Sequence, residues 1–227
     1  MGMNRSADAP IRFRQLGPED RARLARVAAA AFDGNRFYQN ALGLDARRFA
    51  LFWEAFFRLA LSDSAATVYG LEQNGELEAA LAVAFDGFPH AIRGARYLLA
   101  LLRRLGLPAW LRYLRFVRAY ERVMHRPAPE RQLEARALWL FVKPDAASAG
   151  LGLRLARDSI EAVRARGKLL ATGLVDASNR PLLSFYRRLG FAVTPPFPLA
   201  GMPAARIERW LVSPRPEAMK EGVPCSS

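Results

Sequence analysis

Two glycines, Gly150 and Gly152, lie at the start of a segment with a helical pattern, shortly after a run of apolar residues at 138–142. The first amides of a helix lack intrahelical acceptors and carry the positive end of the helix dipole, so they suit an anion. A glycine at this point lets a phosphate approach the backbone without meeting a Cβ. The spacing is therefore typical of a phosphate-binding loop, but an ordinary strand-to-helix turn is an equally open interpretation.

Two common phosphate-binding motifs do not account for these glycines. A P-loop needs a Gly-Lys-Ser/Thr sequence, and none follows here. A dinucleotide-binding fingerprint matches only weakly, because its third glycine is replaced by Leu155. Taken alone, the loop leaves its function open.

Further residues that could do chemistry follow at Asn179, Tyr186 and Gly190-Phe191. Together with Val142-Lys143-Pro144 and Gly150-Leu151-Gly152, their order and spacing resemble the GNAT superfamily of acyl-CoA-dependent N-acetyltransferases. Members of this superfamily typically have Val-x-Pro at the end of an apolar strand and Gln/Arg-x-x-Gly-x-Gly/Ala at the start of a helix. An Asn, a Tyr and a Gly-Phe pair come after the next strand.

The match covers about residues 135–195 and has one departure, since Ala147 stands where the family has Gln or Arg and Ser148 where a Gly often follows. Before residue 135 only the order of the elements agrees. Backbone amides hold the pyrophosphate in this family, so the resemblance still implies acetyl-CoA as the cosubstrate. It implies that the strand end binds the acyl and pantetheine groups around Leu140, Phe141 and Val142. It implies that the pyrophosphate lies against the amides of Ala147, Ser148, Ala149, Gly150, Leu151 and Gly152.

The resemblance also implies roles for individual side chains. Asn179 would bind the pantetheine side or steady the next helix, and Tyr186 would protonate the leaving thiolate as a general acid. A half-buried core tyrosine is the alternative for Tyr186. Some family members use a glutamate as the general base at the position of Arg136, and Glu134, two residues earlier, would point to the same face of a regular strand. Glu134 is thus the candidate base, with a water-mediated base as the alternative.

The chain is strongly basic, with a formal net charge of +13 that arginine carries almost entirely. Its surface should attract anions such as phosphates, acidic substrates, nucleic acid or lipid headgroups. Four arginines recur at helical spacing and share one face: Arg112, Arg115, Arg118 and Arg122. This face is either solvated or binds an acidic acceptor, the 3′-phosphate of CoA, nucleic acid or a membrane surface. No recognised reading helix is evident, so specific nucleic-acid binding is not expected.

Metal chemistry and membrane insertion are not expected. The two histidines, His90 and His125, are far apart and lack metal-ligand spacing, and the single cysteine, Cys225, has no basic neighbour to activate it. The apolar run Tyr97–Leu102 is much too short to span a bilayer, and the N-terminus has no apolar signal-peptide core. We therefore expect a cytoplasmic protein. For its oligomeric state, we expect a monomer or a homodimer.

Hydrophobic periodicity predicts the elements that position these residues. A first helix is expected to open at 17–20 and to run to Phe32. Further helices are expected over the aromatic stripe 49–60, within 89–124, and over 150–166 and 180–189. Strands are expected at 11–16, 67–73, 76–85, 135–142, 169–175, 191–194 and 206–212, with Asn74-Gly75 as a hairpin turn and 125–132 as a Pro-rich connector.

These elements predict a single α/β domain over 1–227, with a helical insert at 89–130 and a flexible tail at 213–227. The resemblance implies a mixed, mostly antiparallel twisted sheet with helices on both faces, which opens in a V at a central parallel pair. The leading hypothesis is an acetyltransferase that acts on a primary amine of a small molecule or peptide. The alternatives are a non-catalytic acyl-CoA-binding or regulatory domain and a basic nucleic-acid or membrane-surface adaptor.

Overall fold

The computed structural model of the chain describes residues 10–33, 35–61, 66–85 and 95–211. One mixed sheet forms the centre, with the strand order β1-β2-β3-β4-β5-β8-β6, and β7 pairs with β8. The strands are β1 (Arg12–Leu16), β2 (Ala66–Gln73), β3 (Glu76–Phe85), β4 (Glu134–Val142), β5 (Leu170–Asp176), β6 (Ala192–Val193), β7 (Phe197–Leu199) and β8 (Met202–Trp210).

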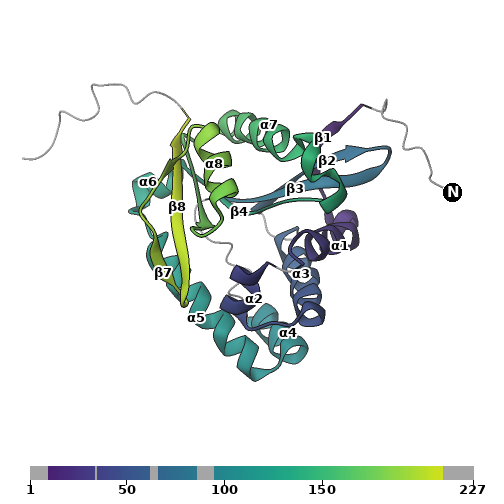
Figure 1. The fold of residues 1–227 in the computed structure, drawn as a ribbon, viewed down its shortest axis with the longest axis vertical. Coiled ribbons are helices and arrows are strands. Elements are labelled where there is room, and N and C mark those ends of the chain that lie inside the picture. Colours follow the sequence, from purple (N-terminus) through teal and green to yellow (C-terminus); the bar gives the residue numbers. More distant parts are fainter. Residues whose placement is uncertain (1–9, 34, 62–65, 86–94, 212–227) are drawn as a thin grey trace, which may run out of the picture.

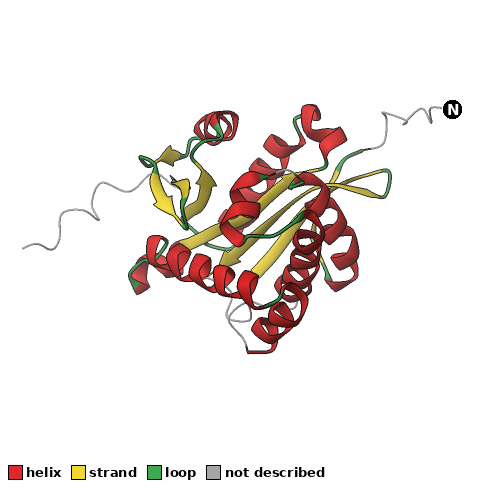
Figure 2. Cartoon of the chain, turned by 60° about the horizontal axis from the view of Figure 1, so that its bottom comes forward, coloured by secondary structure: helices red, strands yellow, loops and turns green. Residues whose placement is uncertain are grey.

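Helices cover both faces of this sheet (Figures 1 and 2). They are α1 (Arg21–Ala31), α2 (Arg36–Leu42), α3 (Ala46–Ala60), α4 (Ala95–Leu105), α5 (Leu107–Val123), α6 (Ala128–Leu133), α7 (Leu151–Ala165) and α8 (Arg180–Arg188), with short 3-10 turns at Pro18–Asp20 and Pro144–Ala149. Helices α1, α3, α4 and α5 lie on one face, and α7 lies on the other (Figure 1). The predicted layering is confirmed.

Among the strands that the structure describes, β4 and β5 are the only parallel pair of neighbours. All the other paired strands run antiparallel. The predicted fold class, a mostly antiparallel sheet with a central parallel pair and flanking helices, is therefore confirmed.

Local turn chemistry explains several element boundaries. Asn74 and Gly75 have φ values of 53° and 76°, as a type I′ hairpin turn requires, and Gly167 ends α7 with a φ of 74°. Three short elements were not predicted: α2, β7 and α6. The stretch 125–132 was expected to be a connector, but α6 begins within it, because proline is tolerated in the first turn of a helix.

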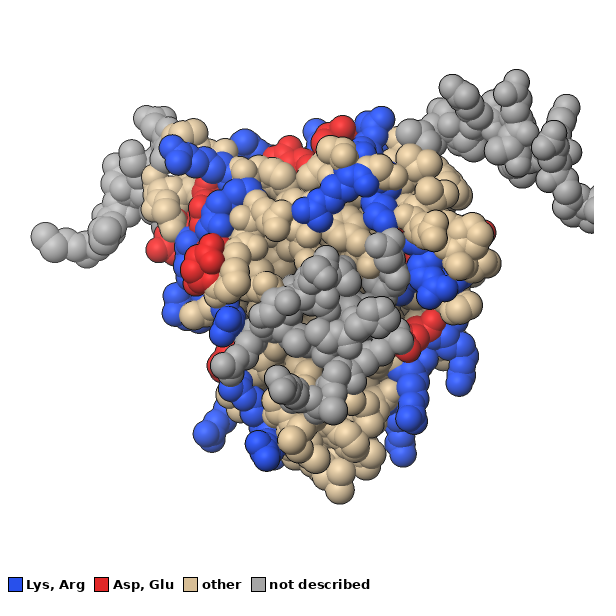
Figure 3. Space-filling model, turned by 180° about the vertical axis from the view of Figure 1, so that it is seen from behind, with Lys and Arg blue, Asp and Glu red and all other residues tan. Residues whose placement is uncertain are grey.

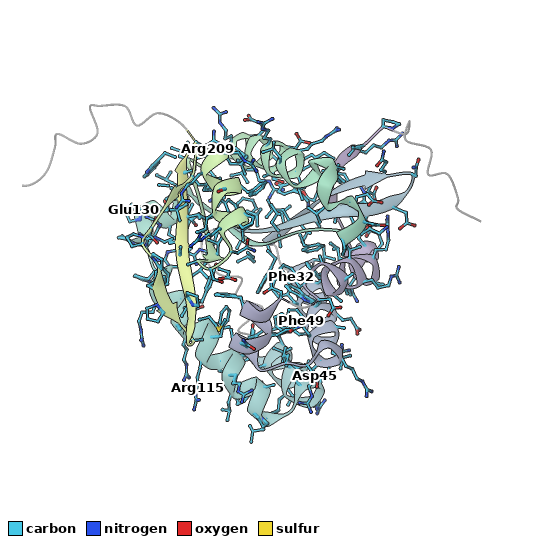
Figure 4. The ribbon with its side chains drawn as sticks, in the orientation of Figure 1. Phe32, Asp45, Phe49, Arg115, Glu130 and Arg209 are labelled. Carbon is cyan, nitrogen blue, oxygen red and sulfur yellow. The ribbon has the colours of Figure 1, made fainter. Side chains whose placement is uncertain are left out.

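The aromatic stripe of α3 forms the core between that helix and the sheet. Trp53 is fully buried, and its ring lies 4.8 Å from that of Phe32 on one side and 4.7 Å from that of Trp139 on β4. Phe49 packs edge-on against Trp53 at 5.5 Å, and Figure 4 shows it near Phe32. The second core lies on the opposite face, where α7 and α8 pack on β3, β4 and β5.

The helical insert packs on the same face as α3. Its described part starts at α4, which contacts α3, and α5 follows after Gly106 and contacts α2. The first six residues of the predicted insert, 89–94, and the predicted tail, 213–227, lie outside the described residues.

The predicted basic face of α5 is exposed and makes no ion pair within the described part of the chain: Arg112, Arg115, Arg118 and Arg122. Figure 3 shows the molecule from behind, with most of the visible basic side chains near its outline and a few acidic ones among them. Exposure without an ion pair is what a solvated helix face shows.

We predict that Trp53→Ala lowers the free energy of unfolding by about 3–5 kcal/mol, because it removes a fully buried ring and leaves a cavity. Urea unfolding followed by circular dichroism measures this change. Trp210→Ala is the matched control, since Trp210 is 48% exposed and should cost much less. Equal losses for the two variants would contradict the assignment of α3 to the core.

Candidate active site

The two central strands separate part-way along their length. Residues 134–137 of β4 pair with residues 170–173 of β5, and the pairing ends at Ala137 and Gly173. Beyond that point β4 continues to Val142, and β3 is its only partner among the described strands. The register with β3 changes here, because Trp139 faces Ala82 and Ala137 faces Val83, which leaves Leu138 as an extra residue. A bulge of this kind bends the strand, so β4 turns away from β5.

A cleft of about 60 Å³ lies between the diverging strands. Residues 137–140 of β4 and 173–176 of β5 line it, together with Asn179 and Tyr186. The edge of β4 that faces β5 has no strand partner past Ala137 among the described residues. This edge therefore offers a place where a ligand with amide groups of its own could take the position of a strand partner.

Tyr186 projects from α8 into the region of this cleft. Its side chain is 8% exposed, and its ring packs edge-on against Phe185 at 5.1 Å and Phe191 at 5.5 Å. Burial raises the pKa of Tyr186 to about 12, because the charged phenolate is poorly solvated here. The hydroxyl is therefore protonated at neutral pH and can donate a proton.

Asn179 lines the cleft and also begins α8. Its side-chain Oδ1 accepts a hydrogen bond from the backbone N of Leu182 at 3.0 Å, which is a standard N-cap contact. Of the two roles predicted for Asn179, the structure contains the one in which it steadies the helix that carries Tyr186. A contact with a pantetheine group stays a prediction.

The glycine loop directly precedes α7. Gly150 has a φ of 71°, which favours glycine, and a Cβ added there would meet no other atom within 4 Å. A Cβ on Gly152 would come within 3.3 Å of Cγ2 of Val142, so this glycine lets the helix start close to the end of β4. The loop therefore leaves open space beside the first amides of α7.

A second, larger groove of about 480 Å³ runs along this helix start. Four of the predicted cofactor-binding residues line it, namely Leu140, Val142, Gly150 and Gly152. Leu140 also lines the cleft between β4 and β5, so it borders both spaces. The strand end and the glycine loop, predicted separately from the sequence, thus share one groove.

Two arginines that the sequence analysis did not single out line the same groove. Arg157 lies on α7 and Arg188 on α8, and neither makes an ion pair within the described residues. Both side chains are exposed, so their charge adds to the positive end of α7. Arg157 is about two helical turns from Gly150, so it lies on the same side of α7. This spacing could have identified Arg157 from the sequence.

The other predicted cofactor-binding residues lie at the end of β4, in the 3-10 turn before α7 and at the start of α7. Phe141 and Leu151 are each 3% exposed and direct their side chains into opposite cores. Ala147, Ser148 and Ala149 lie in the 3-10 turn that leads into Gly150. Contacts of these five residues with a cofactor stay predictions.

The geometry argues against Glu134 as the general base. Glu134 is 1% exposed and lies where β4 and β5 are still paired, away from the cleft. Its Oε2 lies 2.7 Å from Nη2 of Arg136, and its Oε1 accepts a hydrogen bond from Thr172. Arg126 approaches the same Oε1 at 3.7 Å. Both carboxylate oxygens thus already have partners. Glu134 lies at the end of the strand pair where β4 and β5 are still hydrogen-bonded, which is the closed end of the V-shaped opening.

We predict that Glu134→Gln destabilises the fold by about 3–5 kcal/mol, because Arg136 stays buried without its counter-charge. Thermal and urea unfolding measure this. Glu161→Gln is the control, since Glu161 is 69% exposed and its ion pair with Arg164 is worth about 1 kcal/mol or less. A Glu134→Gln variant as stable as the control would reopen a functional role for the carboxylate.

Comparisons with known proteins agree with this arrangement. The family model described as FR47-like protein matches residues 134–195, from the start of β4 to just past β6. A GNAT-family acetyltransferase structure from Desulfovibrio desulfuricans has 14% identity and a TM-score of 0.57, and the alignment covers 89% of this chain and all of that one. No sequence among the curated proteins matches.

Two further structures were solved with a cofactor. PaiA N-acetyltransferase from Thermoplasma acidophilum, in complex with coenzyme A, has 15% identity and a TM-score of 0.54 over 88% of this chain and 99% of that one. YncA from Salmonella typhimurium, with acetyl-CoA, has 14% identity and a TM-score of 0.52 over 90% and 96%. The chain has the fold of the GNAT acetyltransferases, and the resemblance seen in its motifs is confirmed. None of the described helices is long and apolar enough to cross a membrane.

Proposed function

We propose that the protein transfers an acetyl group from acetyl-CoA to an amine. The observation that carries this proposal is the separation of β4 from β5 after Ala137, with Tyr186 lining the resulting cleft. The groove at the start of α7 continues from the same strand end through Leu140. The two spaces together offer one path for a long ligand with a phosphate end and a reactive end.

The residues present fit acetyl-CoA. The amides at the start of α7, with Arg157 and Arg188 beside them, match a pyrophosphate in charge and in access. The open edge of β4, residues 138–142, can pair with the amides of pantetheine as a strand partner would. These contacts would hold the donor without the side chain that Ala147 lacks.

The chain's own groups can then assist the transfer. Acetyl-CoA supplies an activated acyl carbon, and the cleft holds donor and acceptor together, which removes much of the entropic barrier. A backbone amide from the open edge of β4 can stabilise the developing oxyanion. The hydroxyl of Tyr186 donates its proton to the leaving thiolate, in a site where burial keeps that hydroxyl protonated.

We predict that the wild-type protein binds acetyl-CoA with micromolar affinity and that Gly150→Glu abolishes the binding. The new carboxylate would occupy the phosphate position and repel it. Isothermal titration calorimetry measures both. Gly167→Glu is the matched control, because Gly167 has nearly the same φ, 74° against 71°, and equally open surroundings at the other end of α7.

Retained binding in Gly167→Glu would show that neither backbone strain nor the added charge causes the loss. If Gly150→Glu bound acetyl-CoA as tightly as the wild type, the groove at the start of α7 would not be the phosphate site. Absence of binding in the wild type would remove the proposed function.

We predict that Tyr186→Phe lowers kcat about a hundredfold or more and leaves acetyl-CoA affinity nearly unchanged, because only the proton donor is lost. Steady-state kinetics with a thiol reagent and calorimetry separate the two quantities. Tyr69→Phe is the control, since it removes a buried hydroxyl from the same core outside the cleft. With the pKa of Tyr186 at about 12, wild-type kcat should not decline between neutral pH and pH 10. Unchanged kcat in Tyr186→Phe would remove this residue from the mechanism.

A non-catalytic CoA-binding domain is the second candidate function. Two residues favour it, namely Ala147 in place of the family's Gln or Arg, and Arg136 in place of a catalytic glutamate. This candidate predicts acetyl-CoA binding without turnover for any amine. The same calorimetry combined with an amine screen distinguishes it from the transferase.

A further inference from the structure

One residue with a carboxylate lines the cleft and lies on the other face of the sheet from Tyr186. Asp176 is the last residue of β5 and lines the cleft. Alternate residues of a strand share a face, so the side chain of Asp176 lies on the face of Leu174, which packs in the core beneath α3 and α5. Tyr186 belongs to the core on the other face. The cleft is thus lined by Tyr186 on one face of the sheet and by Asp176 on the other.

Hydrogen bonds hold the carboxylate of Asp176 in one orientation, and they involve only one of its two oxygens. Its Oδ1 accepts hydrogen bonds from the backbone N of Ser178 at 2.8 Å and from Oγ of the same residue at 2.6 Å. Its Oδ2 has no hydrogen-bond or ion-pair partner within the described part of the chain. Among the described residues that line the cleft, Asp176 is the only charged one. Asp176 is therefore the described lining residue whose charge can attract a cationic group into the cleft.

A small apolar chamber adjoins the cleft on the face of Asp176. Leu138, Trp139 and Leu174 line both spaces, so the two are separated by the same three residues. The rest of the chamber lining comes from α2, α3 and α5 and is mostly apolar, including Phe52 and Phe116, with Tyr113 and Tyr120 as its hydroxyl-bearing members. Its free volume is about 20 Å³, against about 60 Å³ in the cleft. A space of this size accepts little more than the end of a slender, uncharged group.

We propose that the acceptor is a protonated alkylamine with a short uncharged tail, and that Asp176 binds its ammonium group and takes one proton from it. This inference rests on the proposed acetyl transfer and names its acceptor class. The tail lies toward the chamber, and the ammonium group faces Oδ2 of Asp176. Asp176 thereby takes the place of the base that the sequence analysis sought in Glu134.

The proposed transfer conserves atoms and charge. Asp176 takes one proton from the ammonium group and passes it to solvent, which leaves a neutral amine. The nitrogen forms a bond to the thioester carbonyl carbon, and the carbon–sulfur bond breaks. Tyr186 gives its proton to the thiolate and recovers one from the nitrogen that has become an amide. The products are the N-acetylated amine, CoA as the thiol and one released proton.

Three probe acceptors of equal length test this assignment: butylamine, propoxyamine and trimethylenediamine. At neutral pH butylamine is protonated and propoxyamine is not, so only butylamine needs a base. The variant is Asp176→Asn, whose amide oxygen can still accept both hydrogen bonds from Ser178. The control is Asp45→Asn, because Asp45 also accepts a backbone hydrogen bond, from Arg48, and lies at the far end of the molecule from α8 (Figure 4). Both variants change the charge equally.

We expect Asp176→Asn to lower kcat/KM for butylamine about a hundredfold and to leave propoxyamine nearly unchanged. Asp45→Asn should affect neither probe. Equal losses with both probes, or no loss with butylamine, would overturn the role of Asp176. In the wild type, butylamine should be acetylated more efficiently than trimethylenediamine, whose second charge opposes entry into an apolar chamber. The reverse order would overturn the assignment of the tail.

The proposed function is judged separately. A wild type that acetylates propoxyamine but not butylamine keeps the transferase and overturns the acceptor assignment. A wild type that acetylates none of the three probes overturns the acceptor assignment as well, and acetyl-CoA calorimetry then decides whether the donor site stands.

Discussion

The single extra residue at Leu138 is the constraint on which the site depends. β3 holds β4 on one side along nearly its whole length, so an inserted residue can be accommodated only by bending β4 on its other side. The parallel pairing with β5 ends at Ala137, immediately before the bulge. In a strand without the bulge, β4 and β5 would continue to pair, and their main-chain amide and carbonyl groups would hydrogen-bond to each other. The bulge thus converts part of a closed sheet into an open, polar edge inside the molecule.

The other end of the same strand pair is fastened by charge. Arg136 contacts Glu134 at 2.7 Å and also donates to the backbone O of Met124 at 2.7 Å, which ties the end of the helical insert to β4. Arg126 joins the cluster and reaches Glu208 on β8. Buried charges of this kind add little net stability, but removing any one of them leaves the others unpaired. The cluster therefore fixes the closed end of the V and the position of the insert together.

Sequence periodicity and turn chemistry were sufficient for most of the fold. The hairpin at Asn74-Gly75 and the stop at Gly167 depend only on neighbouring residues, and the stripe around Trp53 depends only on helical period. The position of Glu134 relative to the cleft could not be obtained in this way. Strand alternation correctly placed it on the same face as Arg136, but it carries no information on where along the strand the pairing with β5 ends. That boundary depends on the register between β3 and β4, which is a long-range property.

The difference between local sequence patterns and long-range packing also explains why the sequence indicated the glycine loop and Tyr186 but not the residues on the opposite face of the sheet. The glycine loop, Asn179 and Tyr186 all lie within residues 134–195, the segment that the family model matches, so their spacing along the chain reflects their arrangement in space. The opposite face is assembled from α2, α3 and α5, which precede that segment and converge only through packing. The proposed donor site is encoded in one continuous segment and therefore leaves a motif. The proposed acceptor site is drawn from separated helices and one strand end, leaves no motif, and can be inferred only from the folded chain.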